Sequence, residues 1–265
     1  MIVAVADTQS KEMKHVLETL AEMGLTIHYR IPVPELSGAS QKALTQFGRF
    51  YTITYANRFV PVGQLAMKRL LDLVGALVGC VFLGILTVIV GPMIKLESPG
   101  PIFFAQKRVG RNGRIFKMYK FRTMYVQDTT EEKKGWTTKN DPRVTKVGRI
   151  LRKTSIDELP QLFNILIGDM SLVGPRPERP QYVEKFKEEI PRYMIKHQVR
   201  PGLTGWAQIH GRDELEITEK AKLDGWYVEH ISFGLDVKCF FGTITAVLKH
   251  DGVVEGGTGT LHDEK

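Results

Sequence analysis

The sequence predicts an α+β protein in which a membrane-anchored helix precedes a mainly helical domain with one small β-hairpin. Three observations lead to this fold class. Residues 73–94 form an uncharged run of 22 residues, long enough to span a bilayer as a helix. Two β-type segments joined by an Asn-Gly turn follow this run. Beyond them, apolar residues recur mainly at helical spacing.

Charge is distributed unevenly along the chain of 265 residues. Residues 68–154 carry 18 basic and six acidic side chains, whereas residues 155–265 carry 13 basic and 18 acidic ones. A basic block of this kind suits nucleic acid, anionic lipid or a phosphorylated substrate, although a solvated surface explains it equally well. The two cysteines, Cys80 and Cys239, exclude a disulfide framework and a cysteine-rich metal site.

Residues 1–62 are predicted to contain a β-α-β fragment and a linker. Residues 2–5 form a short apolar strand, residues 10–23 a helix ended by Gly24, and residues 25–31 a second strand. The glycines that bind phosphate in dinucleotide folds are missing after the first strand, which argues against nucleotide binding here. No cleavable signal peptide is recognised at the start. Turn residues are frequent over residues 32–62, so little regular structure is expected there.

Residues 63–97 are predicted to form the membrane-inserted helix. Basic residues flank the apolar run on both sides, for example Lys68 before it and Lys95 after it. A spanning helix normally shows an excess of Lys and Arg on one side only, so equal flanks favour a re-entrant helix that returns to the same face. Gly84 and the pair Gly91-Pro92 are candidate bends. An ordinary single-span anchor remains the alternative.

Residues 98–250 are predicted to form the main domain, and residues 251–265 a flexible Gly-rich tail. Strands are expected at residues 102–108 and 114–124, with Lys120 and Arg122 on one face of the second strand by the two-residue alternation. Helices are expected at residues 143–153 and 154–167. The apolar helix at residues 235–249 could lie at a membrane interface.

Asp157 and Glu158 are the strongest candidates for chemistry. Ser155 and Glu158 fit a capping box, and Asp157 would then simply occupy the first turn of a helix. Neighbouring carboxylates at a helix start can also hold Mg²⁺ beside a substrate phosphate, which the helix N-terminus attracts. Pro160 places both carboxylates near the helix start.

A second candidate is Arg176, which stands between two prolines. The prolines restrict the backbone and preorganise the guanidinium for a bidentate contact with phosphate. Trp206 could stack on a base, but burial is its more common role. Asp224 could bind metal or sugar, but an aspartate on a helix surface is the default.

The chain resembles the bacterial sugar transferase family over about residues 64–249. Its monotopic phosphoglycosyl transferases move a sugar 1-phosphate from a UDP-sugar to undecaprenyl phosphate. The resemblance is carried, in order, by Lys68-Arg69-Leu70-Leu71-Asp72, Ser98-Pro99-Gly100-Pro101, Phe116-Lys117-Met118-Tyr119-Lys120-Phe121-Arg122-Thr123-Met124, Asp141-Pro142-Arg143, Asp157-Glu158-Leu159-Pro160-Gln161-Leu162, Gly168-Asp169-Met170-Ser171-Leu172-Val173-Gly174-Pro175-Arg176-Pro177 and Arg200-Pro201-Gly202-Leu203-Thr204-Gly205-Trp206.

The resemblance implies a role for particular residues. Asp157 would be the nucleophile and Glu158 its partner, with both close to a Mg²⁺ cofactor. The groups expected to face the substrate phosphates are Lys120, Arg122, Arg176 and Arg200. Weaker candidates for substrate contact are Pro175, Trp206, Arg212 and Asp224.

The implied reaction passes through a phosphosugar-aspartate intermediate and releases UMP. Residues 177–180 and 190–194 resemble members that transfer glucose or galactose 1-phosphate, which favours UDP-glucose or UDP-galactose. The reaction would be the first membrane step of exopolysaccharide, capsule or lipopolysaccharide O-antigen synthesis, on the cytoplasmic face of the bacterial inner membrane. Expected partners are the UDP-sugar, undecaprenyl phosphate and membrane lipids, with no nucleic acid, and a homo-oligomer is left open.

The chain departs from the family pattern at two points. Gly84-Ile85 stands where family members usually bend the helix at Ser-Pro. Larger members carry a Rossmann-like domain and spanning helices before the catalytic part, and residues 1–60 resemble only the last portion of that domain.

Two other functions were weighed against this one. A direct glycosyl transferase lacks support because the chain has no Asp-x-Asp motif. A nonenzymatic nucleic-acid or membrane binding protein would leave Asp157 and Glu158 unexplained.

Overall fold

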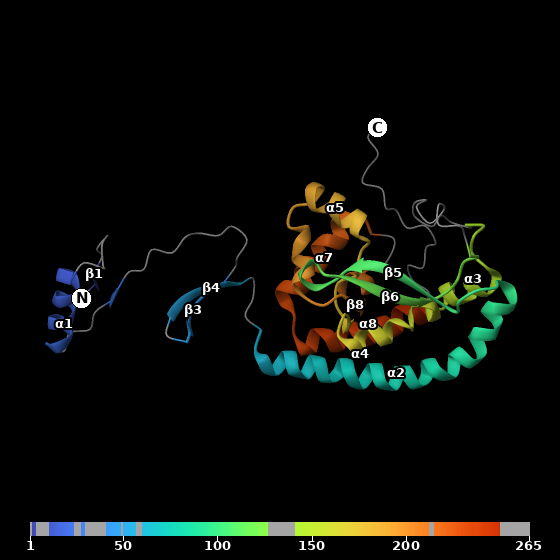
Figure 1. The fold of residues 1–265 in the computed structure, drawn as a ribbon, viewed down its shortest axis with the longest axis horizontal. Coiled ribbons are helices and arrows are strands. Elements are labelled where there is room, and N and C mark those ends of the chain that lie inside the picture. The colour runs from blue at the N-terminus through green and yellow to red at the C-terminus, as the bar shows by residue number, and fades with distance from the viewer. Residues whose placement is uncertain are drawn as a thin grey trace. The chain divides into compact units, whose positions relative to one another are not determined.

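The computed structural model describes residues 2–3, 11–23, 28–29, 41–48, 50–56, 60–126, 141–211 and 215–249. The chain divides into two compact units, residues 1–59 and residues 60–265. The expectations for the tail at residues 251–265 and for Arg212 lie outside the described residues. Figure 1 shows the elements in chain order.

The first unit contains the predicted β-α-β fragment. Strand β1 (Ile2–Val3) pairs in parallel with β2 (His28–Tyr29), and helix α1 (Lys11–Glu22) lies between them in the chain. The two strands and the helix follow one another in the predicted order, and each strand is shorter than predicted.

The expectation of little regular structure over residues 32–62 is wrong. Strands β3 (Gln41–Phe47) and β4 (Phe50–Ala56) form an antiparallel hairpin. Its turn includes Gly48, whose φ of 62° is accessible to glycine at little cost. The hydroxyls of Thr45 and Thr52 lie 3.0 Å apart across the ladder. Aromatic and β-branched residues along β4 favour a strand, and this signal outweighs the turn residues before it.

Helix α2 (Val62–Glu97) opens the second unit and contains the predicted membrane helix. It continues without interruption through Gly84 and Pro92, and its last turns curve toward α3 (Figure 1). Gly75 and Gly79 allow close packing. A Cβ atom at these positions would lie 2.6 Å from Leu172 Cδ1 and 2.8 Å from Leu162 Cδ1, respectively.

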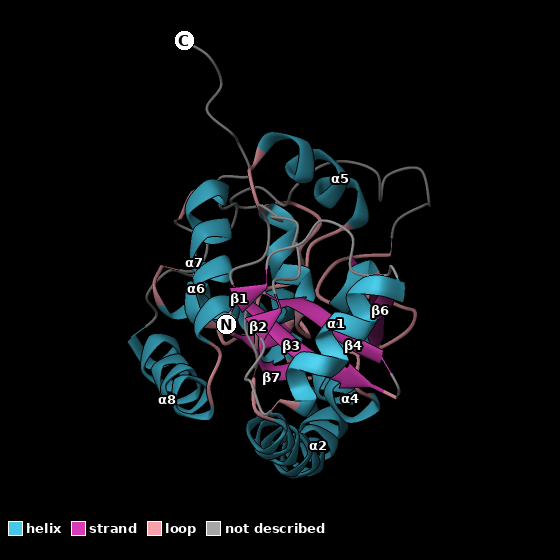
Figure 2. Cartoon of the chain, turned by 90° about the vertical axis from the view of Figure 1, so that its left-hand side faces the viewer, coloured by secondary structure: helices cyan, strands magenta, loops and turns pink. Residues whose placement is uncertain are grey.

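One face of α2 packs on the second unit and the other is exposed. Among the described helices, α2 alone is long and apolar enough to cross a membrane. Figures 1 and 2 show it along one side of this unit, beside α4 and α8. The exposed apolar residues on α2 are Val62, Leu65, Met67, Leu70, Leu73, Val74, Leu77, Val78, Val81, Phe82, Ile85, Val88, Ile89, Met93 and Leu96.

Three charged residues anchor the beginning of α2. Lys68 Nζ donates to the carbonyl oxygen of Val173 at 2.8 Å and to Asp236 at 2.8 Å. Arg69 donates to the last carbonyl groups of α4, 2.8 Å from Ile165 O and 3.0 Å from Leu166 O. Asp72 is buried, and its Oδ1 accepts from Ser171 Oγ and from Leu172 N. The charged motif at residues 68–72 therefore fixes α2 to the domain.

The remaining elements include the predicted hairpin and the predicted helix before residue 154, but the helix expected over residues 154–167 is divided into a 3₁₀ turn and a shorter helix after Pro160. Strands β5 (Phe103–Val109) and β6 (Ile115–Phe121) form the expected hairpin, around the turn η1 (Arg111–Gly113) with Asn112 at φ 56°. Helices and 3₁₀ turns follow as α3 (Lys146–Lys153), η2 (Ile156–Glu158), α4 (Gln161–Ile167), α5 (Pro180–Glu189), η3 (Tyr193–Gln198), α6 (Trp206–Ile209), α7 (Ile217–His230) and α8 (Phe233–Lys249).

A second strand pair lies at the centre of the domain. Strand β7 (Ser171–Val173) pairs in parallel with β8 (Gly202–Thr204). The main hydrophobic core surrounds this pair and includes Met118, Ile165, Met170 and Tyr227. Elements from distant parts of the chain thus meet around β7, which leads directly into the loop that carries Arg176.

Candidate active site

The carboxylates of Asp157 and Glu158 lie in the tight turn η2 ahead of α4. Ser155 begins this turn in the left-handed region, at φ 56°, and its side chain makes no capping hydrogen bond. Pro160 then precedes the first residue of α4, Gln161. The capping box is not formed, so a capping role does not explain the presence of Glu158 at this position.

Two cations bind Glu158. Lys120 Nζ lies 2.7 Å from Glu158 Oε1. Arg176 donates from Nη2 to Oε1 at 2.8 Å and from Nη1 to Oε2 at 3.4 Å. Burial by itself would raise the pKa of Glu158, but the charges of Arg176 and Lys120 outweigh it and hold this pKa well below the ordinary range. Glu158 is therefore ionised at neutral pH and organises the two cations.

Asp157 has a different environment from its neighbour. Its exposed fraction is 8%, and no hydrogen bond or ion pair within the described part of the chain engages its carboxylate. Burial raises the pKa of Asp157 to about 6, which the Lys120 charge opposes and the Glu158 charge reinforces. A carboxylate that forms no hydrogen bond or ion pair with the described residues, and that has a pKa near neutral pH, is suited to act as a nucleophile.

The Arg176 loop is built from two sequence motifs about 25 residues apart. Gly174 N donates to Thr204 O at 2.8 Å, and Gly202 N donates to Pro175 O at 2.9 Å. These bonds extend the β7–β8 pairing into the loop. Pro175, predicted as a weaker substrate contact, is fully buried at this junction.

Arg108 and Glu178 support the same loop, and the sequence did not single out either for this role. Arg108 Nη1 donates to Pro177 O at 3.0 Å and to Glu178 Oε2 at 3.1 Å. Val109 N donates to Glu178 O at 2.9 Å. Strand β5 thus holds the chain just beyond Arg176. In the sequence, only the positions of these two residues indicated such a role. Arg108 lies shortly before the predicted hairpin turn, and Glu178 lies two residues after Arg176.

Lys120 and Arg122 do not act together, although they are two residues apart. Lys120 reaches Glu158, whereas Arg122 has an exposed fraction of 7% and donates to Ser98 O and, at 3.1 Å, to Pro99 O. Strand β6 ends at residue 121, and Arg122 follows it with its backbone N–H bonded to Ile102 O at 2.8 Å. The structure therefore places the Arg122 guanidinium on the turn after α2. Arg200 is half-buried, and among the described residues its side chain forms no hydrogen bond or ion pair with Asp157 or Glu158.

The weaker candidates lie elsewhere. Trp206 is partly buried, stacks on Trp226 with ring centroids 4.7 Å apart, and has Lys238 5.1 Å from its ring. Asp224 forms a buried ion pair with Lys196 at 2.7 Å. No contact within the described chain ties Trp206 or Asp224 to Asp157.

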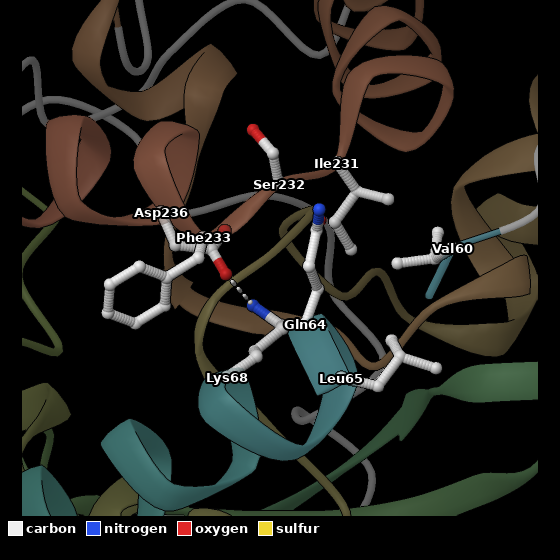
Figure 3. Close-up of a pocket in the computed structure, with 8 residues that line it drawn as sticks. All are labelled: Val60, Gln64, Leu65, Lys68, Ile231, Ser232, Phe233 and Asp236. Carbon is white, nitrogen blue, oxygen red and sulfur yellow. Dashed lines mark hydrogen bonds and ion pairs between the residues drawn. The ribbon is translucent and has the colours of Figure 1, made fainter. Parts of the chain in front are cut away.

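Figure 3 shows a small pocket at the beginnings of α2 and α8. The Lys68 ammonium and the Asp236 carboxylate point toward each other in it. The pocket contains none of the predicted site residues, and its two charged groups already satisfy each other. The lining residues are Val60, Gln64, Leu65, Lys68, Ile231, Ser232, Phe233 and Asp236.

Asp157 and Glu158 are the candidate ligands for the expected magnesium ion. No group of three or more His, Cys, Asp or Glu residues in the described chain could hold a metal by itself. Mg²⁺ commonly uses one or two carboxylates, substrate phosphate oxygens and water. Asp157 has no hydrogen-bond or ion-pair partner among the described residues and could join such a shared site, whereas Glu158 already pairs with Lys120 and Arg176.

Comparison with known proteins adds an independent finding. Residues 63–250 match the family model described as bacterial sugar transferase. The chain is 37% identical to galactosyl transferase CpsE of Streptococcus agalactiae serotype III (strain NEM316) over 253 residues, which are 91% of this chain and 55% of that protein.

Two further relatives carry more explicit names. The UDP-N-acetylgalactosamine-undecaprenyl-phosphate N-acetylgalactosaminephosphotransferase of Aeromonas hydrophila is 45% identical over 185 residues, 69% of this chain and 44% of that protein. The UDP-glucose:undecaprenyl-phosphate glucose-1-phosphate transferase of Escherichia coli (strain K12) is 43% identical over 183 residues, 67% of this chain and 39% of that protein. The chain thus spans about half the length of these relatives or less.

Proposed function

Because this chain belongs to the bacterial sugar transferase family, we propose that it transfers a sugar 1-phosphate from a UDP-sugar to undecaprenyl phosphate and releases UMP. The names of the relatives from Aeromonas hydrophila and Escherichia coli support the substrate classes. The observation that carries the proposal is the contrast between two adjacent carboxylates. Glu158 is engaged by Lys120 and Arg176, while Asp157 has no partner among the described residues.

In the first step, a carboxylate oxygen of Asp157 attacks the β-phosphorus of the UDP-sugar. The bond from this phosphorus to the bridging oxygen breaks, the electron pair leaves on UMP, and a phosphosugar-aspartate remains. Lys120 and Arg176, which both pair with Glu158, would neutralise the pyrophosphate charge that otherwise repels the nucleophile. Glu158 holds both cations in place.

In the second step, a phosphate oxygen of undecaprenyl phosphate attacks the same phosphorus. The bond between phosphorus and Asp157 breaks, which frees the carboxylate and yields a lipid-linked sugar diphosphate. Asp157 and Glu158 would also hold Mg²⁺ with the substrate phosphates, where the ion would supply additional positive charge.

The acceptor is a lipid, so we propose that the exposed face of α2 contacts the bilayer on the cytoplasmic side of the inner membrane. Helices α4 and α8, which both contact α2, also carry exposed apolar residues, namely Phe163, Ile167, Phe240, Phe241 and Ile244. At 36 residues α2 is about 54 Å long, yet both of its ends contact the same unit. This arrangement favours a helix that stays on one face over one that crosses.

The identity of the donor sugar is inferred from two short segments of the sequence. We favour UDP-glucose or UDP-galactose as donor, for synthesis of exopolysaccharide, capsule or lipopolysaccharide. The resemblance of residues 177–180 and 190–194 to members using these sugars supports this choice. Glu178, within the first segment, bonds to Arg108 and so helps position the Arg176 loop.

A panel assay tests the proposed function. The purified protein is incubated with undecaprenyl phosphate, Mg²⁺ and one UDP-sugar at a time, and released UMP and UDP are separated by chromatography. We expect UMP with at least one donor and its loss on chelation by EDTA. Without the lipid acceptor, intact-protein mass spectrometry should show a sugar-phosphate adduct that Asp157→Asn lacks. Release of UDP in place of UMP would contradict the proposal.

A further inference from the structure

The last residue of α2 is bound to the start of α3, 49 residues further along the chain. Glu97 Oε1 accepts a hydrogen bond from Lys146 N at 2.6 Å. The other carboxylate oxygen accepts one from Val147 N at 2.8 Å. A single side chain therefore joins the membrane helix to α3 through two backbone hydrogen bonds.

These two bonds complete the N-terminus of α3. Thr145 caps the helix by accepting from Gly148 N at 2.8 Å, and its carbonyl oxygen accepts from Arg149 N at 2.9 Å. The first two N–H groups of α3 remain for Glu97. A carboxylate at this end also interacts favourably with the helix dipole.

Helix α3 leads directly into the active site. Only two residues separate its end, Lys153, from the turn that carries Asp157. Gly148 packs so closely on Thr123 that a Cβ atom would overlap the Thr123 carbonyl oxygen. Arg152 Nε donates to Thr123 Oγ1 at 2.9 Å. Any shift of α3 would therefore move the segment of Asp157 relative to β6, which carries Lys120.

The other end of α2 holds the opposite side of the site. Asp72 accepts from Leu172 N at 2.8 Å, and Lys68 donates to Val173 O at 2.8 Å. Strand β7, which contains both residues, leads into the Arg176 loop. Helix α2 thus contacts both segments that bring Asp157 and Arg176 together.

We propose that Glu97 is a positioning residue, which holds α3 so that Asp157 lies correctly beside Lys120 and Glu158. This inference rests on the proposed function for its catalytic consequence, but its structural content stands separately. Glu97 also ends the helix that has the exposed apolar face. The position of α2 against the rest of the unit is thereby coupled to the position of Asp157.

Glu97→Gln tests the inference, because the amide can accept from one N–H group but turns its own N–H₂ toward the other. The kcat for UMP release should fall about tenfold or more, since a misplacement of about 1 Å at the reacting atoms can cost on the order of 100-fold. The KM for the UDP-sugar should change little, because the cations remain in place. Glu188→Gln, an exposed glutamate of α5, is the matched control and should alter neither quantity.

Hydrogen exchange measured by mass spectrometry gives a readout that does not depend on activity. In Glu97→Gln the amides of residues 146–158 should exchange faster, with β5 and α7 unchanged. Unchanged exchange in this segment, or an even increase over the whole unit together with unchanged kcat, would overturn the inference. If the wild-type protein releases no UMP from any donor, the proposed function fails and the exchange comparison alone decides the inference.

Lys146→Pro provides a second variant if Glu97→Gln does not fold. It removes the N–H group bonded to Glu97 Oε1 while placing proline at the first position of α3, which helices tolerate well. Thr145 already has the extended backbone, with φ −69° and ψ 162°, that a following proline requires. Faster local exchange and a lower kcat are expected, and wild-type values for both would refute the role of this bond.

Discussion

Replacing Asp157 with asparagine should make the protein more stable while removing its nucleophile. Burial raises the pKa of Asp157 from its ordinary value of 3.8 to about 6. Above pH 6 the folded protein therefore carries a buried charge that the unfolded chain carries in water. The difference between the two pKa values corresponds to a cost of about 3 kcal/mol.

The sign of this stability change follows from the protonation equilibria of Asp157 in the folded and unfolded states. Below the unfolded pKa the carboxyl is protonated in both states, so its ionisation does not affect stability. As pH rises through the folded pKa, the folded state loses about 3 kcal/mol relative to a neutral side chain. Asp157→Asn should therefore gain most at pH 8, and this gain should fall to roughly half at pH 5.

Thermal unfolding in detergent with EDTA measures this effect. A gain of about 3 kcal/mol corresponds to a rise in Tm on the order of 5–10 °C for a unit of this size. Glu188→Gln should leave the Tm unchanged at both pH values, because its carboxyl is exposed. A lower Tm for Asp157→Asn at pH 8, or a gain equal at pH 5 and pH 8, would refute the assigned burial cost.

Three further predictions concern catalysis and topology. Arg176→Lys should lower kcat/KM by about 10- to 150-fold, equivalent to about 1.5–3 kcal/mol, because lysine can form neither the two-nitrogen contact with Glu158 nor a bidentate contact with phosphate. An unchanged value would remove this residue from the proposed phosphate site. The kcat/KM for UMP release should fall about tenfold per pH unit below about pH 6, as the nucleophile becomes protonated, and a flat profile down to pH 5 would contradict this. In a Cys80→Ser, Cys239→Ala background, both Tyr51→Cys and Glu188→Cys should resist a membrane-impermeant thiol reagent until the cells are lysed. Labelling of only the first in intact cells would show that the helix crosses the membrane.

Local sequence signals predicted the elements that depend on local physics. The uncharged run predicted α2, the Asn-Gly pair predicted the turn between β5 and β6, and helical spacing predicted α8. Prolines beside Arg176 and the adjacent carboxylates marked the candidate site. Each of these signals lies within a few residues of the feature that it predicts.

The missed contacts join residues far apart in the chain. Glu97 meets Lys146 across 49 residues, and Arg108 meets Glu178 across 70. Periodicity carries no information on such pairs, because it describes one element at a time. The grouping of Lys120 with Arg122 failed for a related reason, since Arg122 donates to the turn after α2, a distant contact that strand alternation does not predict.

The way α2 is anchored determines how a water-soluble version of this protein could be made. Deleting the helix would remove the partners of Ser171, Leu172 and the α3 N-terminus. It would also expose the core that Leu83 and Ile94 now cover. The outward-facing side chains of α2, α4 and α8 are the ones to exchange for polar residues, with the inward face left intact. A water-soluble variant would therefore be made by replacing exposed side chains and not by deleting α2.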